Sequence, residues 1–234
     1  GYKDIQGAMI GSDRKTFNGA VTLSYTYKNL IFRNQTTIGS NRSNESPYGS
    51  FSTYARQQPY NAPWDAEGKL NRYFDGWDAG ESKLQNPLYD ATLNNLNRSG
   101  YTEIINNFSI VWKMNDALTV RGKFGISHTD NTSDRYISPE SSEFKNYTGD
   151  EVLRKGRYTL GTGKSTRYEG NLTLSYSKLF NDVHSLYAGV DASISESESY
   201  SYGFVAEGFT NDRPYLGNAL AYAANGMPSA SEST

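Results

Sequence analysis

The segment closest to a motif of known chemistry is the glycine-rich run Gly161-Thr162-Gly163-Lys164-Ser165-Thr166. It resembles the end of a phosphate-binding loop, in which backbone N–H groups cradle phosphates. The complete motif requires a glycine where this chain has Tyr158, and a helix must follow it. Here a strand-like alternation follows instead. We therefore expect a flexible segment at the end of a strand and no nucleotide site.

Residues that bind metals or act as nucleophiles are sparse. Cysteine is absent, and His128 and His184 lie far apart without a His-Glu-x-x-His pattern, so no zinc site is expected. Asp75, Asp78 and Glu81 would allow a surface calcium site, but solvated loop acids are the expected state. No Gly-x-Ser-x-Gly elbow occurs and no carboxylate pair stands out for glycoside cleavage. We predict no catalytic residue, no metal and no cofactor, and hence no enzyme.

The most suggestive binding chemistry lies in residues 41–100, where aromatic and acidic residues cluster. Aromatic faces stack on sugar rings, and neighbouring carboxylates fix hydroxyl groups. A long loop also packs its own Tyr and Trp side chains, so most of these aromatic residues could be structural. The candidates for ligand contact are Tyr60, Trp64, Asp65, Trp77 and Asp78.

A second set of polar residues consists of charges placed in the middle of strand-like segments. In a soluble sandwich they would face bulk water, whereas in a barrel they would line an aqueous lumen. The predicted lumen-lining residues are Arg33, Arg121, Lys123, Arg167 and Glu169.

These residues are positioned by segments with strict period-two alternation, which is typical of β-strands. In the first segment Phe17, Val21 and Leu23 alternate with Asn18, Thr22 and other small polar residues, over about the 9–11 residues that a tilted strand needs to cross a bilayer. The predicted strands cover residues 17–27, 30–40, 101–114, 118–127, 167–176 and 186–194.

The connections between these strands alternate between short and long. The long ones cover 41–100, 129–156 and 197–234, and aromatic residues collect beside the short turns. Outer-membrane barrels share this asymmetry, with short periplasmic turns and long extracellular loops. The predicted fold is therefore an all-β, antiparallel up-and-down meander that forms part of a transmembrane β-barrel. About six strands cannot close a barrel, so we expect a fragment of a longer chain.

Composition agrees with this interpretation. The net charge of −2 gives no basic surface for nucleic acid. No apolar run reaches the ~18 residues of a helical membrane span. The mean hydropathy of −0.71 suits strands in which only alternate residues are apolar.

Short loop motifs carry a family resemblance. Residues 46–54 read Ser-Pro-Tyr-Gly-Ser-Phe-Ser-Thr-Tyr and are followed by Gln58-Pro59-Tyr60. Residues 86–92 read Asn-Pro-Leu-Tyr-Asp-Ala-Thr, with 11–14 (Gly-Ser-Asp-Arg) before the first strand and 207–209 (Glu-Gly-Phe) after the last. In this order, the motifs resemble the SusC/RagA family of TonB-linked outer-membrane transporters over essentially the whole chain.

The resemblance implies a middle portion of a 22-stranded barrel, without the plug domain that the family carries at its N-terminus. It implies import of oligosaccharides or peptides, powered by TonB through the absent plug and assisted by a SusD-like surface lipoprotein that some loop aromatics could contact. The expected location is the bacterial outer membrane, in contact with its lipid. The alternative is a soluble glycan-binding β domain that uses the aromatic loop 41–100. A glycan-cleaving enzyme is the least favoured hypothesis.

Overall fold

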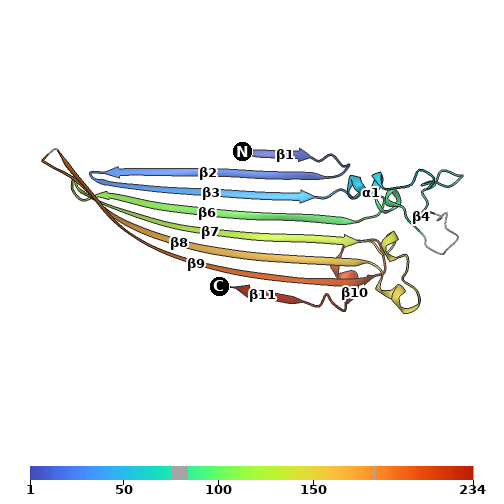
Figure 1. The fold of residues 1–234 in the computed structure, drawn as a ribbon. Helices are drawn as coiled ribbons and strands as arrows, with labels where there is room; N and C mark the ends of the chain where they lie inside the picture. The colour runs from blue at the N-terminus through green and yellow to red at the C-terminus, as the bar shows by residue number, and fades with distance from the viewer. Residues whose placement is uncertain (75–83, 182, 234) are drawn as a thin grey trace.

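The computed structural model describes residues 1–74, 84–181 and 183–233, and its main feature is one antiparallel sheet of nine strands. The long strands lie side by side in a single curved layer (Figure 1). The sheet consists of β1 (Tyr2–Gln6), β2 (Asp13–Tyr27), β3 (Leu30–Asn44), β6 (Leu96–Lys113), β7 (Leu118–Ile137), β8 (Arg157–Phe180), β9 (His184–Phe209), β10 (Ala219–Tyr222) and β11 (Ser229–Ser233). Each strand from β1 to β9 pairs with the next in this sequence, and β10 and β11 both pair with β9. This confirms the predicted all-β meander.

The tight turns all lie at one end of the sheet and the long connections at the other, which we call the turn end and the loop end (Figure 1). Lys28 and Asn181 have φ angles of 52° and 51°, as tight hairpin turns require. Asn115 closes the turn before β7, where its Oδ1 accepts hydrogen bonds from the N–H groups of Ala117 (2.9 Å) and Leu118 (2.8 Å).

The strands extend further toward the loop end than the sequence pattern indicates. β7 continues through Ile137, so the loop predicted at 129–156 begins at residue 138. β3 and β6 shorten the predicted 41–100 loop to 45–95. Within 197–234, β9 continues to Phe209, and β10 and β11 fold back onto it. In the β3 and β7 extensions polar residues occupy both faces of the sheet, so no hydrophobic alternation marks them as strands. In β9 Tyr200, Tyr202 and Phe204 do alternate with small residues, and the sequence prediction missed this pattern.

Short elements in the loops complete the described chain. They are the helices α1 (Phe51–Ala55) and α2 (Pro87–Asp90), the strand pair β4 (Tyr73–Phe74) and β5 (Leu84–Gln85), and the 3-10 turns η1 (Ser142–Phe144), η2 (Gly149–Arg154) and η3 (Leu216–Asn218). Among the described residues, no helix is both long and apolar enough to cross a membrane.

The buried core is small and lies at the loop end. Tyr136, Phe144 and Phe209 are almost completely buried, and the ring centroids of Tyr136 and Phe209 are 5.1 Å apart. In contrast, Val21 and Leu23 in the middle of β2 are 63% and 66% exposed. Within the described part of the chain, no second sheet or helical layer covers the middle of the long strands.

Candidate functional site

The strand register divides the side chains of the sheet between two chemically different faces. One row of directly paired residues crosses the sheet as Leu23, Asn34, Phe108, Phe124, Gly170 and Ile194. The neighbouring row, one residue along, reads Ser24, Arg33, Ser109, Lys123, Asn171 and Ser193. Because successive side chains of a strand point to opposite faces, these rows define an apolar face and a polar face.

The large side chains of the apolar face form a continuous band near the turn end. We call this the apolar band. It consists of Phe17, Val21, Leu23, Tyr25 and Tyr27 on β2; Leu30, Phe32 and Ile38 on β3; Ile104, Phe108, Ile110 and Trp112 on β6; Leu118, Val120, Phe124 and Ile126 on β7; Tyr168, Leu172, Leu174 and Tyr176 on β8; and Leu186, Val190 and Ile194 on β9.

The apolar band runs obliquely across the strands. Its loop-end limit is Phe17 on β2 and Ile194 on β9, yet Ile194 lies in the row of Leu23 rather than that of Phe17. This offset of about six residues corresponds to roughly 20 Å along the strands, over about 24 Å across five strand spacings. The turn-end limit is Tyr27 on β2 and Leu186 on β9. It shifts in the same direction, because the row of Tyr27 contains Val190, four residues before the turn-end limit of β9 is reached at Leu186. The loop-end limit thus inclines the strands to the band's perpendicular by about 40°, and the four-residue offset of the turn-end limit gives about 30°, for a mean of about 35°, at the lower end of the range found in transmembrane barrels.

A small polar cluster interrupts the apolar band. The amides of Asn34 and Asn106 exchange two hydrogen bonds of 3.1 Å, and Asn106 Nδ2 also donates to Thr36 Oγ1 at 2.7 Å. The cluster joins β3 to β6, which no tight turn connects. It satisfies most of the polar groups that these side chains bring to an otherwise apolar surface.

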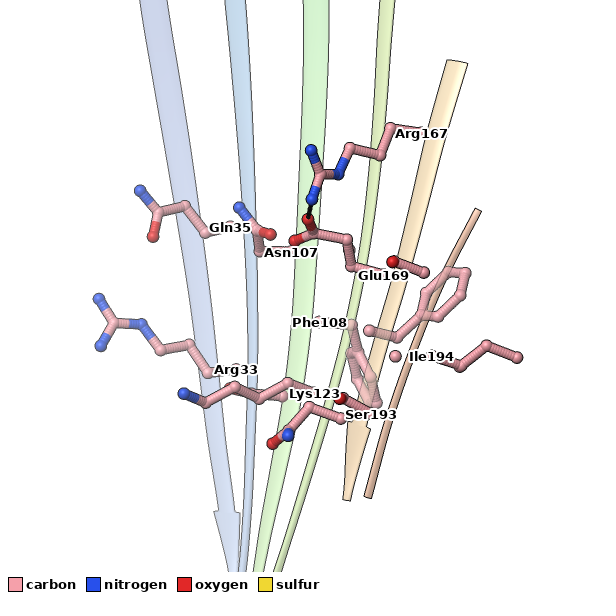
Figure 2. Close-up of a pocket in the computed structure, with 15 residues that line it drawn as sticks. Arg33, Gln35, Asn107, Phe108, Lys123, Arg167, Glu169, Ser193 and Ile194 are labelled. Atoms are coloured by element: carbon pink, nitrogen blue, oxygen red, sulfur yellow. Dashed lines mark ion pairs between the residues drawn. The ribbon is translucent and has the colours of Figure 1, made fainter. Parts of the chain in front are cut away.

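The polar face holds the candidate site, a hollow of about 630 Å³ over the middle of the sheet. Figure 2 shows Arg33, Lys123 and Glu169 projecting to one side of the strands while Ile194 points to the other. Of the five predicted lumen-lining residues, four line this polar hollow. The fifth, Arg121, lies on the same face nearer the turn end, with its Nη1 3.5 Å from Ser175 Oγ.

The charges in the polar hollow leave a positive excess. Arg167 Nη2 and Glu169 Oε1 form an ion pair of 2.5 Å (Figure 2). Arg33 and Lys123 lie in one cross-strand row, and neither has an ion-pair partner among the described residues. Amide and hydroxyl groups of Gln35, Asn107 and Ser109 surround them. This lining suits hydrated, polar or anionic groups better than apolar ones.

The aromatic residues predicted to contact ligand are only partly described. Tyr60 and Trp64 are 81% and 52% exposed. Asp65 Oδ1 accepts hydrogen bonds from the N–H groups of Glu67 (3.1 Å) and Lys69 (2.7 Å), so this carboxylate stabilises its own turn. Trp77 and Asp78 lie outside the described residues. Ligand contact by this set therefore stays a prediction.

The loop motifs carry structural roles that sequence reasoning missed. Asn86, fully buried, caps α2 by accepting a hydrogen bond from Leu88 N (3.1 Å) and donates to the carbonyls of Pro63 (3.1 Å) and Asn71 (2.6 Å). Asp90 accepts hydrogen bonds from both the backbone N–H and the hydroxyl of Ser142, which joins loop 45–95 to loop 138–156.

The last motif completes the same loop cluster. Glu207, 6% exposed, accepts two hydrogen bonds from Arg154, at 2.6 Å and 3.2 Å. Gly208 has φ +78°, which favours glycine, and Phe209 packs on Tyr136. Motifs far apart in the sequence therefore meet at the loop end. Burial there raises the pKa of the Tyr54 and Tyr89 phenols above the ordinary value of 10.0.

Comparisons with known proteins identify the fold. No family model and no curated protein matches the sequence. Among solved structures, the RagAB peptide transporter superposes with a TM-score of 0.71 at 15% identity, over 95% of this chain. The RagAB peptide importer matches with TM-scores of 0.68 in its closed-closed state and 0.69 in its open-open state, at 14% and 15% identity.

These matches have a defined extent. The chain spans 24–25% of the length of the transporter chains that it matches. At this level of identity the likeness shows a shared fold, that of a segment of these transporters.

Proposed function

We propose that this chain is a wall segment of a TonB-dependent outer-membrane importer of peptides or oligosaccharides. In this proposal the apolar face contacts lipid and the polar face lines an aqueous lumen. Arg33, Arg121, Lys123, Arg167 and Glu169 then contact water, a plug domain or passing solute. The resemblance to SusC/RagA transporters and the structural likeness to the RagAB peptide importer both support this role.

The oblique apolar band is the observation that carries the proposal. The band covers nine residues on each of β3, β6, β7, β8 and β9 and eleven on β2, and at about 3.4 Å per step and about 35° inclination it is roughly 22–28 Å high. This range includes the apolar height of about 25 Å in outer-membrane barrels. A soluble sandwich has no reason to limit its apolar residues to a strip of nearly constant height that crosses its strands at this angle.

The edges of the sheet support membership in a larger barrel. Among the described residues, β2 from Gly19 to Tyr27 pairs only with β3, and β9 from His184 to Glu198 pairs only with β8. Unpaired backbone groups cost several kcal/mol each in hydrocarbon, so both edges need partner strands in a membrane. The family resemblance supplies these as the other strands of a 22-stranded barrel.

The loop end would then face the cell exterior. The connections 45–95, 138–156 and 210–218 are held together by the Asp90–Ser142 contact and by Asn94, whose backbone and side chain both contact Asp212. A preorganised loop cluster suits contact with a surface lipoprotein. The exposed Tyr60 and Trp64 suit contact with either the lipoprotein or the cargo.

The test is to express the complete gene product in a bacterial host and to follow its location and transport activity. We expect it in the outer-membrane fraction, soluble only with detergent, with an electrophoretic mobility that changes on boiling. Uptake of fluorescent peptides or oligosaccharides should cease when the proton gradient is collapsed. A protein that stays monodisperse in buffer without detergent would contradict the proposal and favour the soluble glycan-binding domain.

A further inference from the structure

The polar hollow contains more cations than its own carboxylate neutralises. Its charged side chains are Arg33, Lys123, Arg167 and Glu169. Glu169 is paired with Arg167, so Arg33 and Lys123 have no ion-pair partner among the described residues. Both are exposed on the face that would line the lumen. Their charges are therefore not compensated within the polar hollow.

The next carboxylates on the polar face do not supply this compensation. Asp191 on β9 lies two strand spacings and two residues from Lys123, roughly 12 Å between Cα atoms. Its carboxylate accepts hydrogen bonds from Asn171 Nδ2 (2.9 Å) and Thr173 Oγ1 (2.5 Å). Glu103 on β6 lies six residues along the strands from the row of Lys123, roughly 20 Å away. The two unpaired cations are therefore available to an external anion.

Arg33 and Lys123 are placed to act on one group. They belong to one cross-strand row, on β3 and β7, with Ser109 of β6 between them. Two strand spacings, roughly 10 Å, separate their Cα atoms. Both long side chains project from the same side of the sheet (Figure 2). A carboxylate held above Ser109 can therefore accept charge-assisted hydrogen bonds from the guanidinium and from the ammonium group.

The neutral polar groups around this pair are also open to a ligand. The side chains of Gln35, Asn107 and Ser109 line the polar hollow and make no hydrogen bond within the described part of the chain. On the apolar face, in contrast, the amides of Asn34 and Asn106 bond to each other. An amide both donates and accepts hydrogen bonds, which suits the backbone groups of an extended peptide.

A glycine lowers the floor of the polar hollow. Gly125 on β7 lies in the same row as Asn107 and Glu169. A Cβ added to Gly125 would lie 3.0 Å from Asn107 Oδ1 and 3.9 Å from Glu169 Cβ, so a side chain here would fill the space between these two residues. Glycine inside a strand often marks a place where a ligand or another backbone approaches closely.

The lining of the polar hollow favours a peptide over a sugar. Among the described residues that line it, the aromatic ones are Phe108 and Phe124, and both belong to the apolar row of the sheet. The polar face therefore offers no aromatic ring here on which a sugar ring could stack. A neutral oligosaccharide would also leave both cations without a partner, whereas a peptide with acidic side chains brings carboxylates and backbone amides together.

We propose that the polar hollow binds a carboxylate of a passing acidic peptide. Arg33 and Lys123 receive the carboxylate, and the amides of Gln35 and Asn107 contact the peptide backbone. Arginine suits this role because its planar fork matches the two oxygens of a carboxylate. The importer then favours acidic peptides over neutral peptides and neutral oligosaccharides. This inference rests on the proposed function, because it requires the polar face to line the lumen.

The experiment measures peptide binding to the complete protein in detergent micelles by fluorescence anisotropy. The probes are two peptides with the same uncharged fluorophore, one of alternating alanine and glutamate and one with glutamine in place of each glutamate. We expect the parent to bind the glutamate peptide at least about tenfold more tightly, the effect of one charge-assisted hydrogen bond. The double variant Arg33→Gln/Lys123→Gln should lose this preference and should bind the glutamine peptide as the parent does.

Two control variants separate charge in the polar hollow from other effects. Lys28→Gln/Lys178→Gln removes the same charge from exposed residues at the turn end and should keep the preference of the parent. Arg33→Lys/Lys123→Arg retains both charges at the site and should keep the preference as well. A loss of preference in either control as complete as in Arg33→Gln/Lys123→Gln would overturn the site.

The remaining outcomes distinguish this inference from the proposed function. Equal affinity of the parent for the two peptides, or an unchanged preference in Arg33→Gln/Lys123→Gln, would overturn the carboxylate site and leave the importer intact. Tighter binding of labelled trigalacturonate than of the glutamate peptide would overturn the assignment to peptides, in favour of an acidic oligosaccharide. A complete protein that needs no detergent would overturn the proposed function itself, together with this site.

Discussion

The inclination of the apolar band predicts that two residues in one cross-strand row tolerate a charge very differently. Leu23 and Ile194 belong to the same row. Leu23 lies in the middle of the band on β2, whereas Ile194 is its last large apolar residue on β9. If the band contacts lipid, Leu23 is at the bilayer centre and Ile194 is at the interface.

The expected magnitudes follow from the depth dependence of arginine in barrel walls. Arginine costs about 2–4 kcal/mol at the bilayer midplane and about 0–1 kcal/mol near the interface. Leu23→Arg should therefore destabilise the complete barrel by about 2–4 kcal/mol, and Ile194→Arg by less than about 1 kcal/mol. Val190→Arg, mid-band on β9, should resemble Leu23→Arg although it lies in a different row.

The assay is reversible unfolding of the complete protein in phospholipid vesicles by guanidinium chloride, followed by tryptophan fluorescence. Thr22→Arg, adjacent to Leu23 but on the polar face, is the control for facing and should change the free energy of unfolding by less than about 1 kcal/mol. Equal destabilisation by Leu23→Arg and Ile194→Arg would refute the inclination. Equal destabilisation by Leu23→Arg and Thr22→Arg would refute the assignment of lipid and lumen faces.

Three further predictions concern the polar cluster and the loops. Asn106→Ala leaves Asn34 without its amide partner on the apolar face and should lower the free energy of unfolding in vesicles by about 1–3 kcal/mol. The control Asn107→Ala, one residue away on the polar face, should have little effect. A larger effect of Asn107→Ala than of Asn106→Ala would contradict the assigned faces. Asp90→Ala removes both contacts to Ser142 and should speed tryptic cleavage of loop 45–95 severalfold. The control Glu67→Ala, on the exposed turn, should not change the cleavage rate. Identical digestion of the Asp90→Ala variant and the parent would mean that this contact does not hold the loops together. Burial raises the Tyr54 pKa above 10.0, so the neutral phenol contributes fully to loop stability below about pH 10. This contribution is lost as the pH rises through the higher pKa of the folded state. Subtilisin cleavage of loop 45–95 should therefore increase in that pH range, and Tyr54→Phe should weaken the increase.

The alternation of residues was sufficient to predict the middle of the long strands, where one face is apolar, but the alternating Tyr200, Tyr202 and Phe204 of β9 were missed. Val21 and Leu23 against Thr22 and Ser24 define both a strand and its two faces, because a period of two occurs only in extended backbone. The same reasoning placed the predicted lumen charges on one face. It failed where both faces are polar, as at Thr129 to Asp134 of β7, because strand pairing there depends on backbone hydrogen bonds that leave no hydrophobic pattern.

The long-range organisation could not be predicted from the sequence. The inclination of the apolar band becomes visible only when the register aligns Ile194 with Leu23. The roles of Asp90 and Glu207 depend on contacts with Ser142 and Arg154, more than fifty residues away along the chain. Their one sequence-level indication was their place in loop motifs that resemble those of a transporter family, and the resemblance does not say that these residues hold loops together.

The bare edges of β2 and β9 have a consequence for biogenesis. Until flanking strands pair with them, each edge presents a row of free N–H and C=O groups beside a surface of exposed Val, Leu and Ile side chains. Such edges are templates for aggregation between chains. In the proposed barrel, these edges must therefore be kept from pairing with other chains until the flanking strands of the same wall cover them.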